Sequence, residues 1–199
     1  QSLADAMKGI DNPYSFILNR DEHLSILQVD GAKDCCIEFN SMSKSNNMPG
    51  WRVGMLSTNA EWAQWILKVK SNIDSGTFRP LQLAAAQALT NNTEEWHKAF
   101  NYDIYHRRRT AARQIMDALS CTYDPAAVGM FLWGRIPEAA TDAEEITEAV
   151  LQKARVFITP GFIFGSNGKR YIRISLCAPE TRIEEALARI KEAQAKGLL

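Results

Sequence analysis

Short apolar runs bounded by turn residues are the main pattern in the first forty positions of the chain. The runs YSFIL (14–18) and CCIEFN (35–40) are rich in aromatic or branched side chains. This composition between turn residues is typical of buried strands. We expect both runs to be strands of a covered sheet.

Helical spacing replaces the short runs after residue 60. EWAQWILKVK (61–70) carries apolar residues on one helical face, and these are Trp62, Trp65, Ile66 and Val69. RPLQLAAAQAL (79–89) has Pro80 near its start, where a helix tolerates proline. From Thr93 to Cys121 there is no proline or glycine, and the apolar residues keep a helical rhythm. We expect two helices and then one long helix, or two joined ones.

The second half alternates predicted strands with predicted helices. Three runs are expected to be strands: GMFLWGRI (129–136), VFIT (156–159) and RYIRISL (170–176). Two capping boxes, Thr141 with Glu144 and Thr181 with Glu184, are expected to open amphipathic helices. A small sheet with helices on one face could form its own domain here, so we place a soft boundary inside the long helix, near residue 110.

Composition and charge limit the kinds of partner. The chain has 23 basic and 23 acidic residues, so no overall field favours a nucleic acid or an acidic membrane surface. No window approaches the length of a membrane span. The four cysteines show neither metal-type nor secreted spacing and are predicted to be reduced core residues, namely Cys35, Cys36, Cys121 and Cys177. We expect a cytoplasmic globular protein with no nucleic-acid or membrane partner.

Lys44 stands in an unusual setting for a lysine. It closely follows an apolar strand and lies among polar residues that include Ser41 and Ser43. A lysine that is partly desolvated at a strand end can act as a nucleophile toward carbonyls. Arg52 follows in the turn PGWRVG, and serine hydroxyls beside an arginine suit a phosphate. The alternative for a lone lysine is an ordinary solvated surface charge.

The segment SMSKSNNMPGWRVG (41–54) resembles the Ser-x-Ser-Lys … Gly-Trp-Arg-x-Gly signature of class I/II aminotransferases. These are fold-type I enzymes that use pyridoxal 5′-phosphate. The resemblance implies that Lys44 forms the Schiff base with the cofactor aldehyde and shuttles the substrate proton. It also implies that Ser41 and Arg52 bind the cofactor phosphate, with Ser43 as a weaker candidate.

Two further stretches match this family in the right order. DNPY (11–14) resembles its Asp-x-x-Tyr motif, which implies that Asp11 pairs with the pyridine nitrogen and that the Tyr14 hydroxyl bonds the ring oxygen. TPGFIFGSNGKRYIRISL (159–176) resembles its C-terminal Pro-Gly-x-x-Phe-Gly … Tyr-x-Arg-x-Ser motif. That match implies that Arg173 holds the substrate α-carboxylate, a task that suits a planar guanidinium.

The resemblance implies an α/β fold. Residues 1–110 would be the remainder of the large pyridoxal-phosphate-binding domain, a mostly parallel sheet with helices, and residues 111–199 a small C-terminal α+β domain. The implied reaction moves an amino group from an α-amino acid to a 2-oxo acid, in a homodimer. KSNIDSGTFRPLQ (70–82) resembles the branch with bacterial aspartate- or diaminopimelate-type enzymes, but it does not select a substrate.

The resemblance covers only the second half of such an enzyme, so we expect a truncated chain. The helix start that holds the phosphate, the aromatic residue that stacks on the cofactor ring and the N-terminal arm have no counterpart, and DAMKGI (5–10) is an unusual lead-in to Asp11. Two alternatives stay open. One is an inactive fragment that acts only as a folding or dimerisation unit, and the other is a pyridoxal-phosphate lyase of the same fold.

Other motif matches are weaker. SMSK (41–44) also fits the Ser-x-x-Lys motif of penicillin-binding proteins and β-lactamases, but the companion Ser-Asp-Asn and Lys-Thr-Gly motifs are absent. The run HRRR (106–109) is predicted to be a solvated helix face or an interdomain salt-bridge site. The three histidines lack metal-ligand spacing, so no metal site is predicted.

Overall fold

The structure is a computed structural model, and it describes residues 8–11, 14, 16–19 and 25–199, with only the backbone described at 8–11. The chain divides into two compact units, Gln1–Asn101 and Tyr102–Leu199, called unit 1 and unit 2 below. The division falls inside the long helical stretch, earlier than the predicted boundary near residue 110. Whether either unit corresponds to a family domain remains a prediction.

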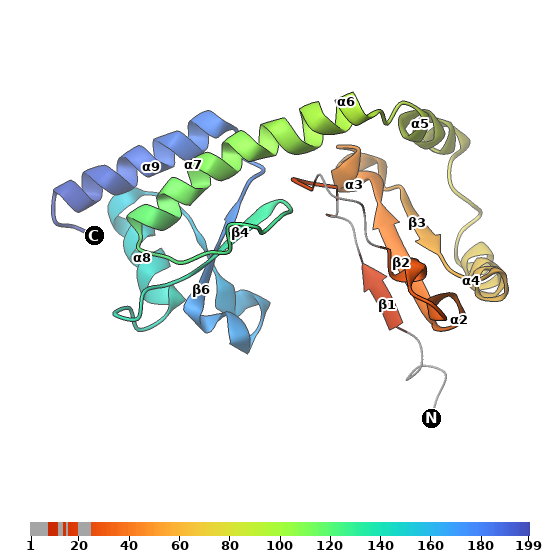
Figure 1. Cartoon of the computed structure of the whole chain (residues 1–199), viewed down its shortest axis with the longest axis horizontal. Coiled ribbons are helices and arrows are strands. Elements are labelled where there is room, and N and C mark those ends of the chain that lie inside the picture. The colour runs from red at the N-terminus through yellow and green to blue at the C-terminus, as the bar shows by residue number, and fades with distance from the viewer. Residues whose placement is uncertain (1–7, 12–13, 15, 20–24) are drawn as a thin grey trace. The chain divides into compact units, whose positions relative to one another are not determined.

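A three-stranded sheet lies at the centre of unit 1. Its order is β1 (Lys8–Asp11), β2 (Cys36–Ser41) and β3 (Gly54–Ser57) (Figure 1). β1 pairs with β2 in parallel, whereas β2 pairs with β3 in the antiparallel sense. The predicted strand at 35–40 is confirmed. The mostly parallel sheet that we expected is not seen in the described strands, because they form one parallel and one antiparallel pair.

The described part of unit 1 also contains helices and tight turns. The short ones are η1 (Ile26–Gln28), α2 (Ala32–Cys35), α3 (Met42–Ser45) and η2 (Pro49–Trp51), and the longer ones are α4 (Ala60–Ile73) and α5 (Arg79–Thr90). The predicted helices at 61–70 and 79–89 are therefore confirmed. Asn59 caps α4 by accepting from the Trp62 N–H, and Pro80 lies in the first turn of α5.

The predicted strand at 14–18 is wrong in its described part. Tyr14 and residues 16–18 form turns and bends, and the Ile17 N–H donates to the Tyr14 carbonyl at 3.0 Å. Leu18 has a φ of 64°, and its N–H donates to the Asn101 carbonyl at 2.9 Å. Ile17 and Leu18 are nonetheless buried. The apolar run therefore marks a part of the core, but its backbone bonds to a helix and not to a sheet.

The long helix is confirmed, with one change in its hydrogen-bond pattern. The backbone is helical through α6 (Glu94–His97), η3 (Lys98–Asp103) and α7 (Ile104–Ala118). The middle segment, η3, is a π-helix. Such segments are rare and often mark functional positions.

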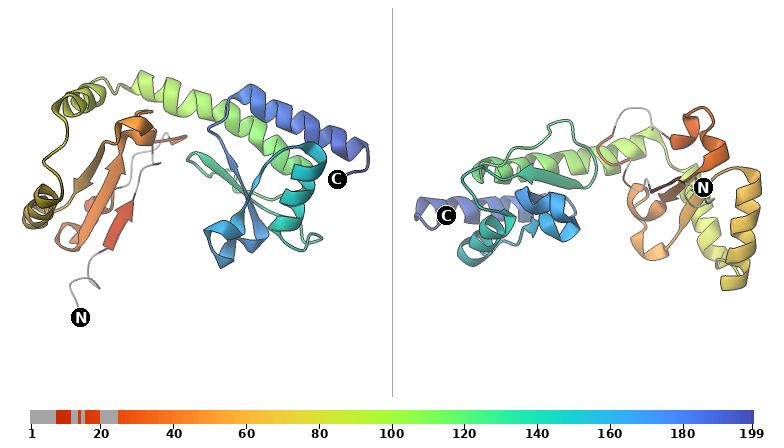
Figure 2. Two further views of the ribbon diagram at one scale, coloured as in Figure 1. Left: turned by 180° about the vertical axis from the view of Figure 1, so that it is seen from behind. Right: turned by 90° about the horizontal axis from the view of Figure 1, so that it is seen from below.

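Unit 2 contains a second three-stranded sheet, and this sheet is antiparallel. Its order is β4 (Phe131–Arg135), β6 (Tyr171–Ser175) and β5 (Thr159–Pro160). It packs with the helices α7, α8 (Ala143–Ala154) and α9 (Glu180–Ala195), and α7 and α9 lie side by side (Figures 1 and 2). The predicted strands at 129–136 and 170–176 are confirmed, whereas VFIT reaches a strand only at its last residue.

Alternation along β4 and β6 assigns one face of this sheet to the core. Leu132, Ile172 and Ile174 are buried, and Gly134 lies against Met116 of α7. A Cβ on Gly134 would stand 2.5 Å from the Met116 Sδ, so glycine lets the helix approach the sheet closely. The other face carries Phe131, Trp133, Tyr171 and Arg173.

Both predicted helices are confirmed, but the capping boxes predicted at Thr141 and Thr181 are wrong. α8 is capped by Asp142, which accepts from the Glu145 N–H at 3.0 Å, and the Thr141 N–H donates to the Glu145 carboxylate. The N-cap therefore lies one residue after the predicted Thr141. α9 begins at Glu180 after Pro179, with no side-chain cap, so Thr181 lies within the helix.

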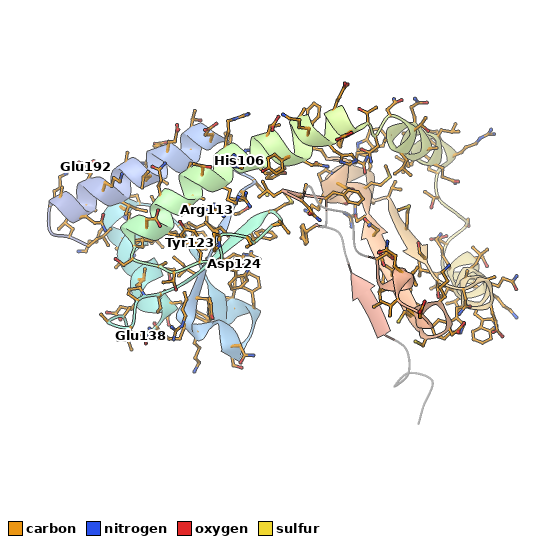
Figure 3. The ribbon with its side chains drawn as sticks, in the orientation of Figure 1. His106, Arg113, Tyr123, Asp124, Glu138 and Glu192 are labelled. Atoms are coloured by element: carbon orange, nitrogen blue, oxygen red, sulfur yellow. The ribbon has the colours of Figure 1, made fainter. Side chains whose placement is uncertain are left out.

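Arginines of α7 hold the loop that precedes β4. Arg109 donates to the Ala127 carbonyl at 2.8 Å, and Arg113 donates to the Pro125 carbonyl and lies over the Tyr123 ring, 5.5 Å from its centroid (Figure 3). Within the HRRR run, Arg107 also forms an ion pair with Glu180. This run thus ties α7 to neighbouring segments of unit 2 and is not simply a solvated face.

The cysteines divide evenly between core and surface. Cys36 and Cys121 are buried, but Cys35 and Cys177 are exposed, so the prediction of four core cysteines holds only for two. None of the four forms a disulfide bond in the structure. Within the described part of the chain, no helix is both long enough and apolar enough to span a membrane.

Candidate active site

Lys44 lies on a single helical turn that begins where β2 ends. Ser41 is the last residue of β2 and also the N-cap of α3, because its Oγ accepts from the Ser43 N–H at 3.2 Å. The Ser45 hydroxyl donates back to the Ser41 carbonyl at 3.1 Å. These bonds stop the strand and curl the backbone, so that Lys44 is presented at the sheet edge and is half-buried.

The Lys44 side chain extends toward Tyr14. Its Nζ lies over the Tyr14 ring, 6.0 Å from the centroid. The distance is at the outer limit of a cation–π contact. The structure therefore brings Tyr14, a second residue predicted from sequence, to the same place.

Asn101 anchors this turn and was not predicted. Its side chain is 2% exposed, and its Nδ2 donates to the Ser45 carbonyl at 2.8 Å and lies 2.9 Å from His97 Nδ1. The main-chain carbonyl of Asn101 accepts a hydrogen bond from the Leu18 N–H. One residue of the π-helix thus joins the lysine turn to the segment after Tyr14. Composition and periodicity carry no signal for such a contact.

Arg52 lies at the same end of the β2–β3 pair as Ser41. Ser41 faces Gly54 in the antiparallel register, and the Met42 N–H donates to the Val53 carbonyl at 3.1 Å. Arg52 has left-handed backbone angles of φ 54° and ψ 44°, which are unfavourable for a residue with a side chain. Its guanidinium is exposed and donates to the Pro49 carbonyl.

The backbone places Asp11 at this sheet edge as well. Asp11 ends β1 and is paired with Phe39, two residues before the end of β2. Because the two strands are parallel, their carboxyl ends meet at one edge, which is where α/β proteins bind ligands. The Asp11 side chain lies outside the described atoms, so its predicted role is untested.

Arg173 belongs to unit 2. It sits on β6, the central strand of the second sheet, directly opposite Trp133 of β4. Its Cζ lies over the rings of Phe131 and Phe164, at 4.2 Å and 4.0 Å from their centroids. Within unit 2 the structure therefore gives this arginine an aromatic environment.

The donors around Lys44 suit a phosphate ester with an aldehyde. Two hydroxyls, of Ser41 and Ser43, and the exposed Arg52 guanidinium are hydrogen-bond donors for a phosphate. The Lys44 amine is the group that reacts with an aldehyde. The residues present thus fit pyridoxal 5′-phosphate by the chemistry of their donor set. Among the described residues no cluster of three or more His, Cys, Asp or Glu side chains could hold a metal ion.

Comparison with known proteins identifies the family that the sequence resembles. The family model for class I and II aminotransferases matches residues 10–190. The chain is 39% identical over 181 residues to the LL-diaminopimelate aminotransferase of Dehalococcoides mccartyi, which covers 90% of the chain and 46% of that relative. It is 41% identical over 182 residues to the enzyme of that name from Aquifex aeolicus, with 91% and 46% covered.

Solved structures of aminotransferases also match most of this chain and about half of their own length. A probable N-succinyldiaminopimelate aminotransferase from Thermus thermophilus matches with a TM-score of 0.81 and 30% identity, covering 93% of this chain and 49% of that one. An aromatic aminotransferase from Pyrococcus horikoshii matches with a TM-score of 0.83 and 25% identity, covering 98% and 52%. The chain spans about half the length of the curated relatives it matches.

Proposed function

The chain belongs to the family of class I and II aminotransferases, and we propose that it provides the lysine-bearing half of a pyridoxal-phosphate-dependent aminotransferase. The proposed reaction transfers an amino group from an α-amino acid to a 2-oxo acid. One observation carries the proposal. Lys44 lies on the turn at the carboxyl end of β2 with its amine over Tyr14, and Ser41 and Ser43 belong to the same turn.

Each residue has a distinct proposed task. Lys44 binds the cofactor covalently and then carries the proton that leaves the substrate Cα. Ser41, Ser43 and Arg52 hold the cofactor phosphate, because hydroxyl and guanidinium donors match its oxygens. When bound, pyridoxal phosphate supplies an electron sink for the bonding pair that remains at Cα.

The remaining tasks belong to residues outside the lysine turn. The Asp11 carboxylate would keep a proton on the pyridine nitrogen of the bound cofactor, and the Tyr14 hydroxyl would donate to its ring oxygen. Arg173 holds the substrate α-carboxylate, so that the bond to be broken has a fixed direction.

Covalent labelling of Lys44 tests the cofactor assignment. The chain would be incubated with pyridoxal 5′-phosphate, reduced with borohydride and mapped by peptide mass. We expect the label on Lys44, its loss in Lys44→Ala, and its retention in Lys68→Ala, which removes an exposed lysine of α4. Label spread over surface lysines, unchanged in Lys44→Ala, would show that this chain does not build the cofactor site.

The names of the relatives suggest a donor to test first. Several curated relatives at 36–41% identity are LL-diaminopimelate aminotransferases, so we propose LL-diaminopimelate as the amino donor. Product analysis with a 2-oxo acid separates transfer from a lyase reaction. Transfer produces a new amino acid from the acceptor, whereas a lyase leaves the acceptor unchanged.

We further propose that the active form is a cytoplasmic homodimer. A second candidate function, a folding or dimerisation unit without catalysis, is favoured by the apolar residues of α4. No residue of this helix is buried, and Leu67, Val69 and Ile73 are exposed. Such a surface favours association. Labelling of Lys44 together with amino transfer would favour the aminotransferase over the non-catalytic unit.

A further inference from the structure

The outward face of the unit 2 sheet collects aromatic side chains around one arginine. In the antiparallel register, Trp133 of β4 is directly opposite Arg173, and Phe131 is its diagonal neighbour on the same face. Phe164 comes from η4 (Gly161–Phe164), which follows β5 directly. Arg173 lies on the central strand and is paired on both sides, so its backbone position is fixed.

Arg173 makes close contacts to aromatic rings, and its hydrogen-bond donors stay unused. Its Cζ is 4.0 Å from the Phe164 centroid, 4.2 Å from that of Phe131 and 6.0 Å from that of Trp133. Its Nε is shielded from solvent and has no hydrogen-bond partner among the described residues. Among the described residues, no acidic side chain forms an ion pair with Arg173.

A shielded donor without a partner costs free energy, so its retention needs a reason. A carboxylate of the protein would satisfy the guanidinium, but it would also cancel its charge and use its in-plane donors. Ring faces stabilise the cation through their quadrupoles and leave those donors unused. An arginine held in this way is oriented, yet still able to bind an anion.

We propose that Phe131 and Phe164, supported by Trp133, are positioning residues that orient the Arg173 guanidinium for a planar carboxylate on an apolar body. This inference rests on the proposed function, because it takes the substrate carboxylate as the ligand of Arg173. With two ring faces close to the Arg173 Cζ, an anion binds at the outer edge of the guanidinium, in the two-pronged geometry of a carboxylate. Trp133 and Phe164 are partly exposed and offer contact to the apolar body.

Nuclear magnetic resonance on the whole chain tests the positioning role without cofactor or turnover. The Arg173 Nε–H signal would be followed while a 2-oxo acid is titrated in. In the free protein, ring currents should displace this signal. We expect Phe131→Leu and Phe164→Leu each to move the signal toward the ordinary arginine position and to weaken carboxylate binding about threefold to tenfold.

Matched variants separate orientation from simple packing. Phe164→Tyr keeps the ring face, so the Arg173 signal should stay displaced and the affinity for the carboxylate should stay that of the wild type. Phe162→Leu changes a similarly exposed phenylalanine of the same helix, with no recorded contact to Arg173, and should change neither. Inorganic phosphate should bind more weakly than the 2-oxo acid.

The outcomes distinguish the inference from the function on which it rests. If Arg173→Lys loses carboxylate binding while both leucine variants bind like the wild type, the positioning role is overturned and the carboxylate role of Arg173 stands. If the Arg173→Lys variant binds the 2-oxo acid with the affinity of the wild type, both the positioning role and the carboxylate role of Arg173 are overturned. Lys44 labelling then shows whether the cofactor half of the proposed function survives.

Discussion

Asn101 Nδ2 donates a 2.8 Å hydrogen bond to the carbonyl of Ser45, the residue next to Lys44, across a sequence separation of 56 positions. Asn101 is almost fully buried and lies in the π-helix η3. A buried amide that bonds a main-chain carbonyl fixes the position of that segment. The lysine turn is therefore held by a helix that lies far along the chain.

Asn101→Leu should loosen this turn. Leucine has a similar volume but no donor, so the Ser45 carbonyl loses its partner, and we expect the free energy of unfolding to fall by about 1–3 kcal/mol. Hydrogen exchange should accelerate at residues 42–48. Asn72→Leu is the control, because the Asn72 Nδ2 makes the same kind of bond to the Lys68 carbonyl on an exposed surface. Equal losses in the two variants would contradict the anchoring role.

Gly168 keeps η4 and η5 (Ser166–Arg170) in close contact. A Cβ at Gly168 would overlap the main chain of Gly161, and main-chain atoms cannot move aside as a flexible side chain can. We expect Gly168→Ala to lower the free energy of unfolding by about 1–3 kcal/mol in denaturant titrations. Gly50→Ala should have little effect, since nothing lies within 4 Å of its Cβ position. Tolerance of alanine at residue 168 would show that this close approach is incorrect.

Arg52 combines unfavourable backbone angles with a proposed phosphate contact. Arg52→Gly removes the guanidinium and suits the left-handed angles, so stability should stay the same or rise by up to about 1 kcal/mol. Arg52→Ala removes the guanidinium but keeps a Cβ, so it should bring no such gain. Both variants should retain pyridoxal phosphate less well in the labelling assay. Unchanged retention in both would exclude Arg52 from the phosphate site.

Burial separates the reactivities of the cysteines. It raises the pKa of the Cys121 thiol to about 11, so near pH 8 this thiol is almost wholly protonated and should react far more slowly with an aromatic disulfide than exposed Cys35 and Cys177. The unfolded chain releases this proton near pH 9.0. The free energy of unfolding should therefore fall as the pH rises from about 9 to 11, and Cys121→Ser should lessen this fall. Rapid labelling of Cys121 in the folded chain would contradict its burial.

Local patterns predicted much of the secondary structure and the position of Lys44. The strand predicted at 35–40 forms at 36–41, where the apolar run ends at a serine that caps the next turn. Helices α4 and α5 likewise follow from helical spacing and from Pro80. For the family itself, motifs in the right order were sufficient.

Features that depend on distant contacts were not predicted. The run at 14–18 has the composition of a strand, but Leu18 bonds to the Asn101 carbonyl, a contact that no local pattern indicates. The aromatic surroundings of Arg173 also depend on register between strands that are far apart in sequence. The cap predicted at Thr141 failed for a different reason, because Asp142 is a competing cap beside it and only the backbone geometry decides between them.

The apolar side chains of α4 should make the chain self-associate. Leu67 and Ile73 are 62% and 79% exposed, and no residue of this helix is buried. Replacing both with lysine adds like charges to the surface and removes its apolar contacts, so sedimentation should show a lower tendency to associate. Gln64→Lys adds one charge at an exposed polar position of the same helix and should change association little. If the double variant and Gln64→Lys associate as strongly as the wild type, contacts elsewhere must drive association, and the helix would lose its proposed role as a dimerisation surface.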